Sequence, residues 1–253
     1  VDKESSKKKY SIPSISVNDV RESLSEACSK FYKNKPQNIV AVTGTNGKSS
    51  VADFFYQILS FNKRKVASIG TLGIVSKKYR KKTNLTSVDA LSLHKNLQIL
   101  NAKKIKNIIL EASSHGLDQN RLDGLLFDIG IFTNLSHDHL DYHKNMRTYL
   151  KSKLYLFDNL IKKGGDIVTD ANIPQSRKIK NISLKRNINL SLIFSKKKGI
   201  ELIAHKFIND KQTLKIKFNN KVYEIELDLI GKIQINNVLM AILAAFKCGI
   251  RFE

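Results

Sequence analysis

Several residue types that mark common classes of protein are scarce in this chain of 253 residues. The two cysteines, Cys28 and Cys248, lie far apart and outside any C-x-x-C or Cys/His spacing, so neither a disulfide framework nor a structural zinc site is indicated. No apolar run approaches the roughly 18 residues that a membrane span needs. The opening VDKESSKKKY lacks the apolar segment of a signal peptide. These absences predict a cytoplasmic protein with reduced thiols.

Acidic residues are also scarce, because 22 Asp and Glu stand against 44 Lys and Arg and leave a net charge of +22. Such an excess is typical of proteins that bind nucleic acid or anionic membranes. The basic residues are nevertheless spread along the chain, with runs at 7–9, 77–82 and 196–198, and aromatic residues do not alternate with them. A general compositional bias is therefore favoured over a dedicated basic groove.

The chain has enough apolar residues to build a core, since hydrophobic side chains make up 42% and charged side chains 26%. From Asn38 onward, short β-branched runs alternate with helical spacing, which predicts an α/β fold with a mostly parallel sheet and flanking helices. The predicted strands are 38–43, 66–70, 107–112 and 127–132, and the predicted helices are 51–59, 89–100 and 145–160.

The two ends of the chain have different patterns. Apolar residues at three- and four-residue steps predict a docking helix from Val17 to Phe31, with Ser16 as its N-cap. After 164–170, runs of alternating residues predict a smaller antiparallel β portion, with a two-residue turn at Asn219-Asn220. Helical spacing then returns at 235–246.

A glycine-rich turn directly follows the first predicted strand. The segment 44–50 joins this strand to an amphipathic helix, which is the context that a phosphate loop requires. Lys48 would contact the β- and γ-phosphates, and the Ser49 hydroxyl would bind Mg²⁺. Val42 stands where the standard motif has its first glycine. The sequence favours an ATP-type nucleotide, bound by Gly44, Thr45, Asn46, Gly47, Lys48, Ser49 and Ser50.

Polar clusters follow two other predicted strands. Glu111 lies at the carboxyl end of 107–112, where open α/β sheets bind ligands, and its carboxylate can hold Mg²⁺. The segment 133–143 carries three of the six histidines, among them His139 and His143. Zinc is the alternative ion, but neither an H-E-x-x-H motif nor a cysteine accompanies these histidines, so Mg²⁺ is favoured.

Five segments together resemble the Mur ligases in order and spacing. They are GTNGKSS (44–50), TSVD (86–89), EASSHGLDQNR (111–121), FTNLSHDHLDYH (132–143) and YLKSK (149–153). The resemblance extends from about Ile12 to Gly249. It implies that 38–253 is the family's central ATP-binding domain and that 1–37, a linker and docking helix, is a remnant of the N-terminal uridine-nucleotide domain. The family's C-terminal ligase domain has no counterpart in this sequence.

The resemblance also implies roles for residues that match the family's motifs. Asn237 would join the phosphate loop in binding ATP. Lys153 would be carbamylated, because a carbamate offers anionic oxygens to a metal that an ammonium would repel. The catalytic residues would be Lys48, Glu111, His139 and Lys153, and the metal ligands Ser49, Glu111, His139 and Lys153. The substrate would be held by Thr86, Ser87, Ser113, Gln119 and Arg121.

The implied activity is ATP-dependent amide ligation in peptidoglycan synthesis. A Mur ligase of the type that this chain resembles adds the third amino acid to UDP-MurNAc-L-Ala-D-Glu through an acyl phosphate, with ATP and Mg²⁺, as a monomer away from the membrane. Arg121 suits a carboxylate of that substrate, although a turn-capping role is equally open. The chain departs from the family at Val88, at Ile233 and Gln234, and at 171–172. These departures concern the expected contacts to the adenine of ATP more than the contacts to its phosphates and metal ion.

Three other functions stay open. A folylpolyglutamate synthetase shares the GTNGK-S pattern, but the segments 111–121 and 132–143 argue against it. The charge alone suggests a nucleotide-binding module that acts on nucleic acid. A partial gene product could bind nucleotide without catalysis. The identity of the added amino acid, meso-diaminopimelate or L-lysine, is left undecided.

Overall fold

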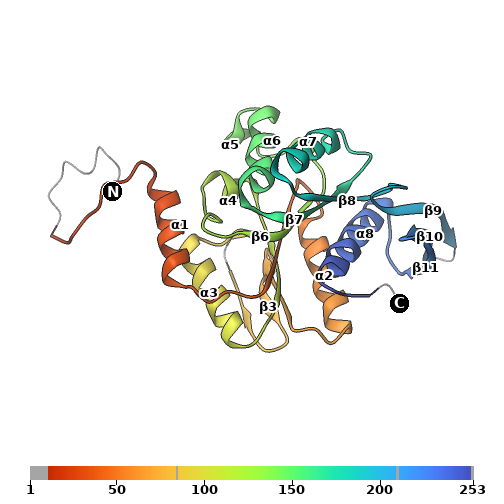
Figure 1. Ribbon diagram of the computed structural model, residues 1–253, viewed down its shortest axis with the longest axis horizontal. Coiled ribbons are helices and arrows are strands. Elements are labelled where there is room, and N and C mark those ends of the chain that lie inside the picture. Colours follow the sequence, from red (N-terminus) through yellow and green to blue (C-terminus); the bar gives the residue numbers. More distant parts are fainter. Residues whose placement is uncertain (1–10, 84, 209–210, 252–253) are drawn as a thin grey trace.

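The computed structural model describes residues 11–83, 85–208 and 211–251, and its strands form one sheet with helices on both faces (Figure 1). Seven strands run parallel: β1 (Asn38–Thr43), β2 (Val66–Gly70), β5 (Asn107–Glu111), β6 (Phe127–Phe132), β7 (Ile161–Asp170), β8 (Asn189–Ile193) and β9 (Gly199–Ile208). Antiparallel strands lie at the two sides: β3 (Gly73–Ser76), β4 (Arg80–Lys81), β10 (Lys211–Phe218) and β11 (Lys221–Leu227). The order across the sheet is β11-β10-β9-β8-β7-β6-β1-β5-β2-β3-β4.

The helices divide between the two faces of the sheet (Figure 1). One face carries α3 (Ala90–Ala102), α4 (Ser114–Asp118), α6 (Met146–Tyr155) and α7 (Ser176–Arg186), and α1 (Val20–Phe31) packs against α3. The other face carries α2 (Lys48–Phe61) and α8 (Lys232–Lys247), which pack against each other. The short helix α5 (Leu140–His143) precedes α6.

Two hydrophobic cores fill the space between the sheet and its helices. Successive side chains of a strand point to opposite faces, so Ile39 and Ala41 of β1 enter one core while Val40 and Val42 enter the other. This double burial explains why the parallel strands appear in the sequence as nearly continuous apolar runs. The predicted α/β class, mostly parallel sheet and antiparallel portion are confirmed. No helix in the described part of the chain has the length and apolarity needed to cross a membrane.

The first helix differs from its prediction in start and packing. It begins at Val20, and its N-cap is Asp19, whose carboxylate accepts hydrogen bonds from the backbone N–H groups of Arg21 and Glu22. The prediction that Ser16 is the N-cap was therefore wrong. Ser25 and Cys28 are its buried residues, and it packs against α3. The larger apolar side chains of the predicted docking face are exposed, namely Val20, Leu24 and Phe31.

Two other predictions need correction. The helix expected over 145–160 changes at Leu156 into a π-helix, η2 (Leu156–Leu160), so the regular α-helix is only ten residues long. Of the runs expected to form antiparallel hairpins, the first becomes β8, which pairs parallel with β7 and β9. Only β9, β10 and β11 alternate in direction, and Asn219 and Asn220 form the predicted turn with positive φ angles.

Candidate functional site

Four adjacent parallel strands end together along one edge of the sheet, named the carboxyl edge below. β1, β2, β5 and β6 reach it at Thr43, Gly70, Glu111 and Phe132. Because β1 pairs with both β5 and β6, the loop after β1 is flanked by the loops that follow its two neighbours. Open α/β sheets bind their ligands at this position. The predicted phosphate loop and the polar clusters therefore meet at one place.

The loop after β1 is held in shape by the loop after β6. The backbone N–H of Thr45 donates to the Asn134 carbonyl at 3.0 Å, and the N–H of Asn46 donates to the Asn134 side chain at 3.0 Å. In return, the Thr45 hydroxyl accepts from the Ser136 N–H at 3.0 Å. These bonds fix the loop without using the N–H groups that follow it.

The start of α2 has the features of an anion site. Gly47 is the N-cap in a left-handed conformation, with φ +86°, and no side chain caps the first turn of the helix. The first N–H groups of a helix lack intrahelical partners and carry the positive end of its dipole. The side chain of Asn237 from α8 lies so close to Gly47 that a Cβ at this position would collide with it. Asn237, which was predicted to bind ATP, therefore lies against the loop. The Asn237 amide in turn donates to the Gln234 side chain at 3.2 Å.

Two lysines from distant parts of the chain converge on one backbone carbonyl. The Lys48 Nζ donates to the carbonyl oxygens of Gly44 and Thr45 at 3.0 and 2.7 Å, and the Lys153 Nζ donates to the same Gly44 oxygen at 2.7 Å. Burial lowers the pKa of Lys48. Burial, and then the positive charge of Lys48, lower the pKa of Lys153 from 10.5 to about 7. Lys153 is only 1% exposed, so a residue that composition alone would place on the surface lies inside the site.

Tyr149 connects these groups. It is fully buried on α6, one helical turn before Lys153, and its ring lies under the Lys153 ammonium at 4.3 Å from Nζ to ring centroid. Its hydroxyl shares a hydrogen bond of 3.1 Å with the Thr45 hydroxyl in the phosphate loop. Tyr149 therefore braces both the loop and the lysine. Sequence reasoning gave it no role, although the four-residue spacing to Lys153 was a usable signal.

Glu111 lies beside the start of α2. Its side chain is 3% exposed and accepts a hydrogen bond of 2.9 Å from the Ser49 hydroxyl. Thr71, after β2, donates to the same carboxylate from its backbone N–H at 2.9 Å and from its hydroxyl at 3.2 Å. A Cβ on Gly70 would collide with Glu111, which explains the glycine at the end of β2. The structure thus pairs the predicted metal ligands Ser49 and Glu111 and adds Thr71, for which the sequence held no signal.

The histidines form a cluster of rings that meet edge to face or at a tilt. His115 lies 4.9 Å from His139 and 5.5 Å from His143 between ring centroids, and His139 lies 6.2 Å from Tyr149. Within the described ranges, no hydrogen bond or ion pair joins His139 to Ser49, Glu111 or Lys153. No group of three His, Cys, Asp or Glu residues that could hold a metal occurs there either. The assignment of His139 as a metal ligand thus stays a prediction.

The predicted substrate residues lie together on the other side of Glu111. The Ser87 hydroxyl donates to the Glu111 carbonyl at 2.8 Å and accepts from the Ser113 N–H at 2.8 Å. The Arg121 guanidinium donates to the Ser87 carbonyl at 2.8 Å and to the Gln119 side chain at 2.5 and 3.0 Å. Ser87 is buried and Ser113 caps α4, so both hydroxyls have structural partners.

The remaining predicted substrate residue is Thr86. Its hydroxyl shares a hydrogen bond of 3.2 Å with the Thr71 hydroxyl, and Thr71 in turn contacts Glu111. The patch is therefore continuous with the Ser49 and Glu111 pair through one threonine. Binding of a substrate by this patch stays a prediction.

A comparison with known protein families agrees with this fold and this site. A family profile described as the Mur ligase middle domain matches residues 42–245. The chain belongs to the Mur ligase family. The resemblance on the five segments is thereby confirmed.

Mur ligases with curated names are similar along most of the chain. UDP-N-acetylmuramoyl-L-alanyl-D-glutamate–2,6-diaminopimelate ligase of Agrobacterium fabrum is 36% identical over 239 residues, which is 94% of this chain and 49% of that protein. The ligase of the same name from Rickettsia montanensis is 37% identical over 243 residues, covering 94% of this chain and 50% of its own length. The chain thus spans about half the length of these relatives.

Solved structures of two Mur ligases and of a folylpolyglutamate synthetase have the same fold. A UDP-N-acetylmuramoyl-L-alanyl-D-glutamate–2,6-diaminopimelate ligase superposes with a TM-score of 0.83 at 26% identity, over 96% of this chain and 51% of that structure. MurF from Thermotoga maritima in complex with ADP gives 0.70 at 18% identity, over 97% of this chain and 54% of its own. The folylpolyglutamate synthetase of Lactobacillus casei gives 0.68 at 14% identity, over 94% of this chain and 63% of its own. The latter two comparisons concern the fold alone.

Proposed function

We propose that this chain is the ATP-binding part of a ligase that joins a diamino acid to UDP-MurNAc-L-Ala-D-Glu in peptidoglycan synthesis. The observation that carries the proposal is the convergence of Lys48 and Lys153 on the Gly44 carbonyl, beside the pair formed by Ser49 and Glu111. The names of the curated relatives support 2,6-diaminopimelate as the added amino acid. The domain assignment follows the same reasoning, with 38–253 as the ATP-binding domain and 1–37 as a linker and helix.

The phosphates of ATP are proposed to bind at the start of α2. The free N–H groups after Gly47 and the helix dipole favour an anion there, and Lys48 adds a positive charge within the loop. The loop bonds to Asn134 and Ser136 hold this arrangement before ATP arrives, so little reorganisation is needed at the moment of reaction.

The Ser49 and Glu111 pair fits a magnesium ion. Mg²⁺ prefers oxygen ligands, and this pair supplies a hydroxyl and a carboxylate from two different elements. The ion would supply charge neutralisation on the phosphate oxygens. Thr71 keeps the carboxylate oriented through two hydrogen bonds, and the lack of space at Gly70 keeps it in place.

Lys153 is suited to the carbamylation that the family resemblance implies. With a pKa of about 7, a large fraction of its side chain is a neutral amine near neutral pH, and only the neutral amine attacks carbon dioxide. The nitrogen forms a bond to the carbon, one proton leaves to solvent, and a carbamate anion results. Lys48, which bonds to the same carbonyl, would then neutralise that anion.

The proposed reaction has two steps. The terminal carboxylate of UDP-MurNAc-L-Ala-D-Glu attacks the γ-phosphorus of ATP, ADP leaves, and an acyl phosphate forms. The amine of the incoming amino acid then attacks the acyl carbon, and inorganic phosphate leaves from the tetrahedral intermediate. This chain's residues position the phosphates and neutralise charge. Arg121, whose guanidinium donates to Ser87 and Gln119, would pair with a substrate carboxylate, and Thr86 would also hold the substrate.

Calorimetric titration tests the proposal. Mg·ATP is titrated into the chain and into Lys48→Ala, with and without UDP-MurNAc-L-Ala-D-Glu. We expect binding that weakens by about 100-fold in the variant and that becomes tighter when the muramoyl dipeptide is present. Lys151→Ala, an exposed lysine on α6, is the matched control and should bind as the unsubstituted chain does. Binding that is equal in all three proteins would contradict the proposal.

A further inference from the structure

A strongly basic region lies at the end of the sheet opposite the carboxyl edge. Residues 54–110 contain twelve Lys and Arg but one acidic residue, Asp89. Lys65 directly precedes β2, Lys106 directly precedes β5, and β3 returns antiparallel to the start of β2. Asp89 caps α3 at the far end, next to the candidate site. The fold thus brings basic residues from three separate segments to this end of the sheet.

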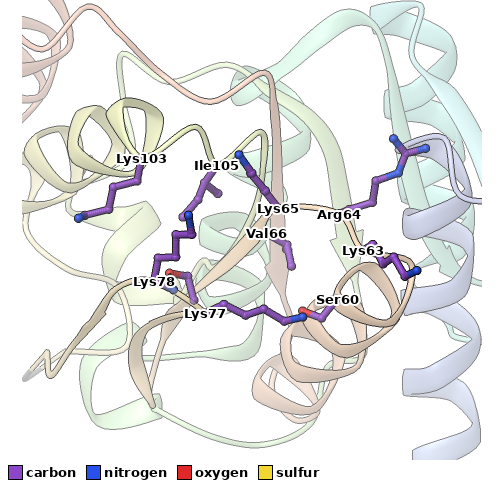
Figure 2. A pocket seen from close by; sticks show the side chains of 10 residues that line it. Ser60, Lys63, Arg64, Lys65, Val66, Lys77, Lys78, Lys103 and Ile105 are labelled. Carbon is purple, nitrogen blue, oxygen red and sulfur yellow. Dashed lines mark hydrogen bonds between the residues drawn. The ribbon is translucent and has the colours of Figure 1, made fainter.

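This region contains a hollow of about 260 Å³ between α2, the β2 and β3 strands and the end of α3 (Figure 2). Its lining includes Lys65, Lys77, Lys78 and Lys103, and in Figure 2 the Lys103 side chain extends away from the other three while Arg64 turns toward α8. The Lys103 ammonium lies 5.6 Å from the centroid of the Tyr79 ring. The buried side chains of Val66 and Ile105 also contribute to its wall.

A second hollow of about 420 Å³ adjoins the first. The two share Lys63, Arg64 and Lys65, and the second adds Lys104 and Lys106. The two hollows together are named the amino-edge groove, and the segment from Lys63 to Lys65 lines both of them. Eight cations line it, and none of its lining residues is acidic or aromatic.

The cations of the amino-edge groove have no acidic partners in the described part of the chain. The acidic residues Asp128 near the start of β6 and Asp166 within β7 are already paired with other lysines, Asp128 with Lys162 at 2.6 Å and Asp166 with Lys247 at 2.7 Å. The other described ion pairs involve residues of 138–139, 196–201 and 211–228. The groove therefore keeps its positive charge.

Favourable interactions with helix dipoles explain only part of this positive charge. α2 and α3 both end beside the groove, and lysines near a helix C-terminus interact favourably with its dipole. Each dipole is equivalent to about half a negative charge, so two helices offset about one of the eight positive charges. A structural role for these lysines does not explain why so many converge on a concave surface.

We propose that the amino-edge groove binds a linear chain of phosphates joined by anhydride bonds, of the kind found in inorganic polyphosphate. The two hollows share three of their cations, so an extended anion that reaches both would meet more positive charge than a single phosphate ion does. Seven of its eight cations are lysines, which act as point charges toward phosphate, whereas recognition of planar carboxylates favours arginine. Without aromatic side chains it offers no stacking platform for nucleic-acid bases.

Binding of short-chain polyphosphate tests the proposal. Calorimetry at an ionic strength of about 0.15 M compares the chain with the triple variant Lys65→Gln, Lys78→Gln, Lys103→Gln. The matched control is Lys178→Gln, Lys180→Gln, Lys185→Gln, which removes three exposed lysines from α7. We expect the groove variant to lose about tenfold or more in affinity, and the control to lose less than about twofold. The slope of the logarithm of affinity against the logarithm of salt concentration should also become shallower by about one for each groove lysine removed.

Three further measurements separate the possible outcomes. Lys48→Ala should still bind polyphosphate, because the phosphate loop is a different site, and the groove variant should still bind Mg·ATP. An unchanged thermal midpoint of the groove variant would show that it is folded. Equal losses in the groove and control variants would overturn the proposal and indicate attraction by net charge alone. Tighter binding of single-stranded DNA, polyglutamate or anionic vesicles than of polyphosphate would overturn it as well.

Discussion

The two ends of the sheet use lysine in opposite ways. At the carboxyl edge, Lys48 and Lys153 have bonds to backbone carbonyls, and burial lowers the pKa of both. In the amino-edge groove, lysines such as Lys65 and Lys103 are exposed and form no ion pair with a described carboxylate. The same side chain is thus buried with a lowered pKa in one place and exposed to solvent in the other. Burial, and not residue type, makes the difference.

The largest expected effect comes from Gly47→Ala at the carboxyl edge. A Cβ there meets both an unfavourable positive φ and the Asn237 side chain, whereas a Cβ on Gly164, also at positive φ, has open space around it. Gly164→Ala should therefore cost about 1 kcal/mol of unfolding free energy, and Gly47→Ala about 2–4 kcal/mol together with most of the Mg·ATP affinity. Chemical denaturation and ATP titration measure both. Equal costs for the two variants would show that Asn237 moves aside freely.

A second effect concerns pH. The pKa of Lys153 is about 7 in the folded chain against an ordinary 10.5, so between these pH values the unfolded chain binds a proton that the native chain does not. Native stability then rises with pH across this window, and below it the cost of burying the charge is complete. Lys153→Met should flatten that rise, while Lys151→Met should not. Thermal unfolding from about pH 6 to about pH 10 in CO2-free buffer tests this, and parallel curves for all three proteins would contradict it.

A smaller effect is expected from removing single hydroxyl groups. Tyr149→Phe loses the bond to Thr45, and Tyr79→Phe loses a bond to Asn96 near the other end of the sheet. Each should cost about 1 kcal/mol of stability. Only Tyr149→Phe should weaken ATP binding, by about fivefold, because only Thr45 belongs to the phosphate loop. A similar loss of ATP affinity in both variants would mean that general stability, and not loop bracing, is responsible.

The smallest effect should follow substitution in the groove. Lys65→Gln with Lys78→Gln is expected to leave Mg·ATP affinity within about twofold of the unsubstituted chain, because no described contact joins these side chains to the phosphate loop. ATP titration of the double variant measures this. A larger change would show that the two ends of the sheet are coupled.

Much of the carboxyl edge could be predicted because its signals are local. The phosphate loop is one contiguous segment between a strand and a helix, and Glu111 ends an apolar run. The parallel strands were predictable because burial on both faces makes them continuously apolar. Two of the wrong predictions concern local detail, namely Asp19 in place of Ser16 as the N-cap and the change to a π-helix at Leu156. The third, the direction of β8, depends on its pairing with β7 and β9.

Other features depend on tertiary contacts that no local pattern encodes. Lys153 is one basic residue among 44, and its burial depends on the packing of α6 against the phosphate loop. Thr71 reaches Glu111 only because β2 pairs with β5. The amino-edge groove arises because the starts of β2 and β5 and the end of α3 lie together in space. Charge that looks scattered along a sequence can therefore be concentrated by topology.

The helix α2 gives these two ends a mechanical link. It begins at Lys48 in the phosphate loop and ends at Phe61, which is 81% exposed, just before Lys63 of the groove. Its 14 residues make a stiff rod of about 21 Å. Any tilt that nucleotide binding imposes at its start is carried to its far end as a displacement. Since the chain has no tryptophan, Phe61→Trp would supply a single indole whose fluorescence reports such movement.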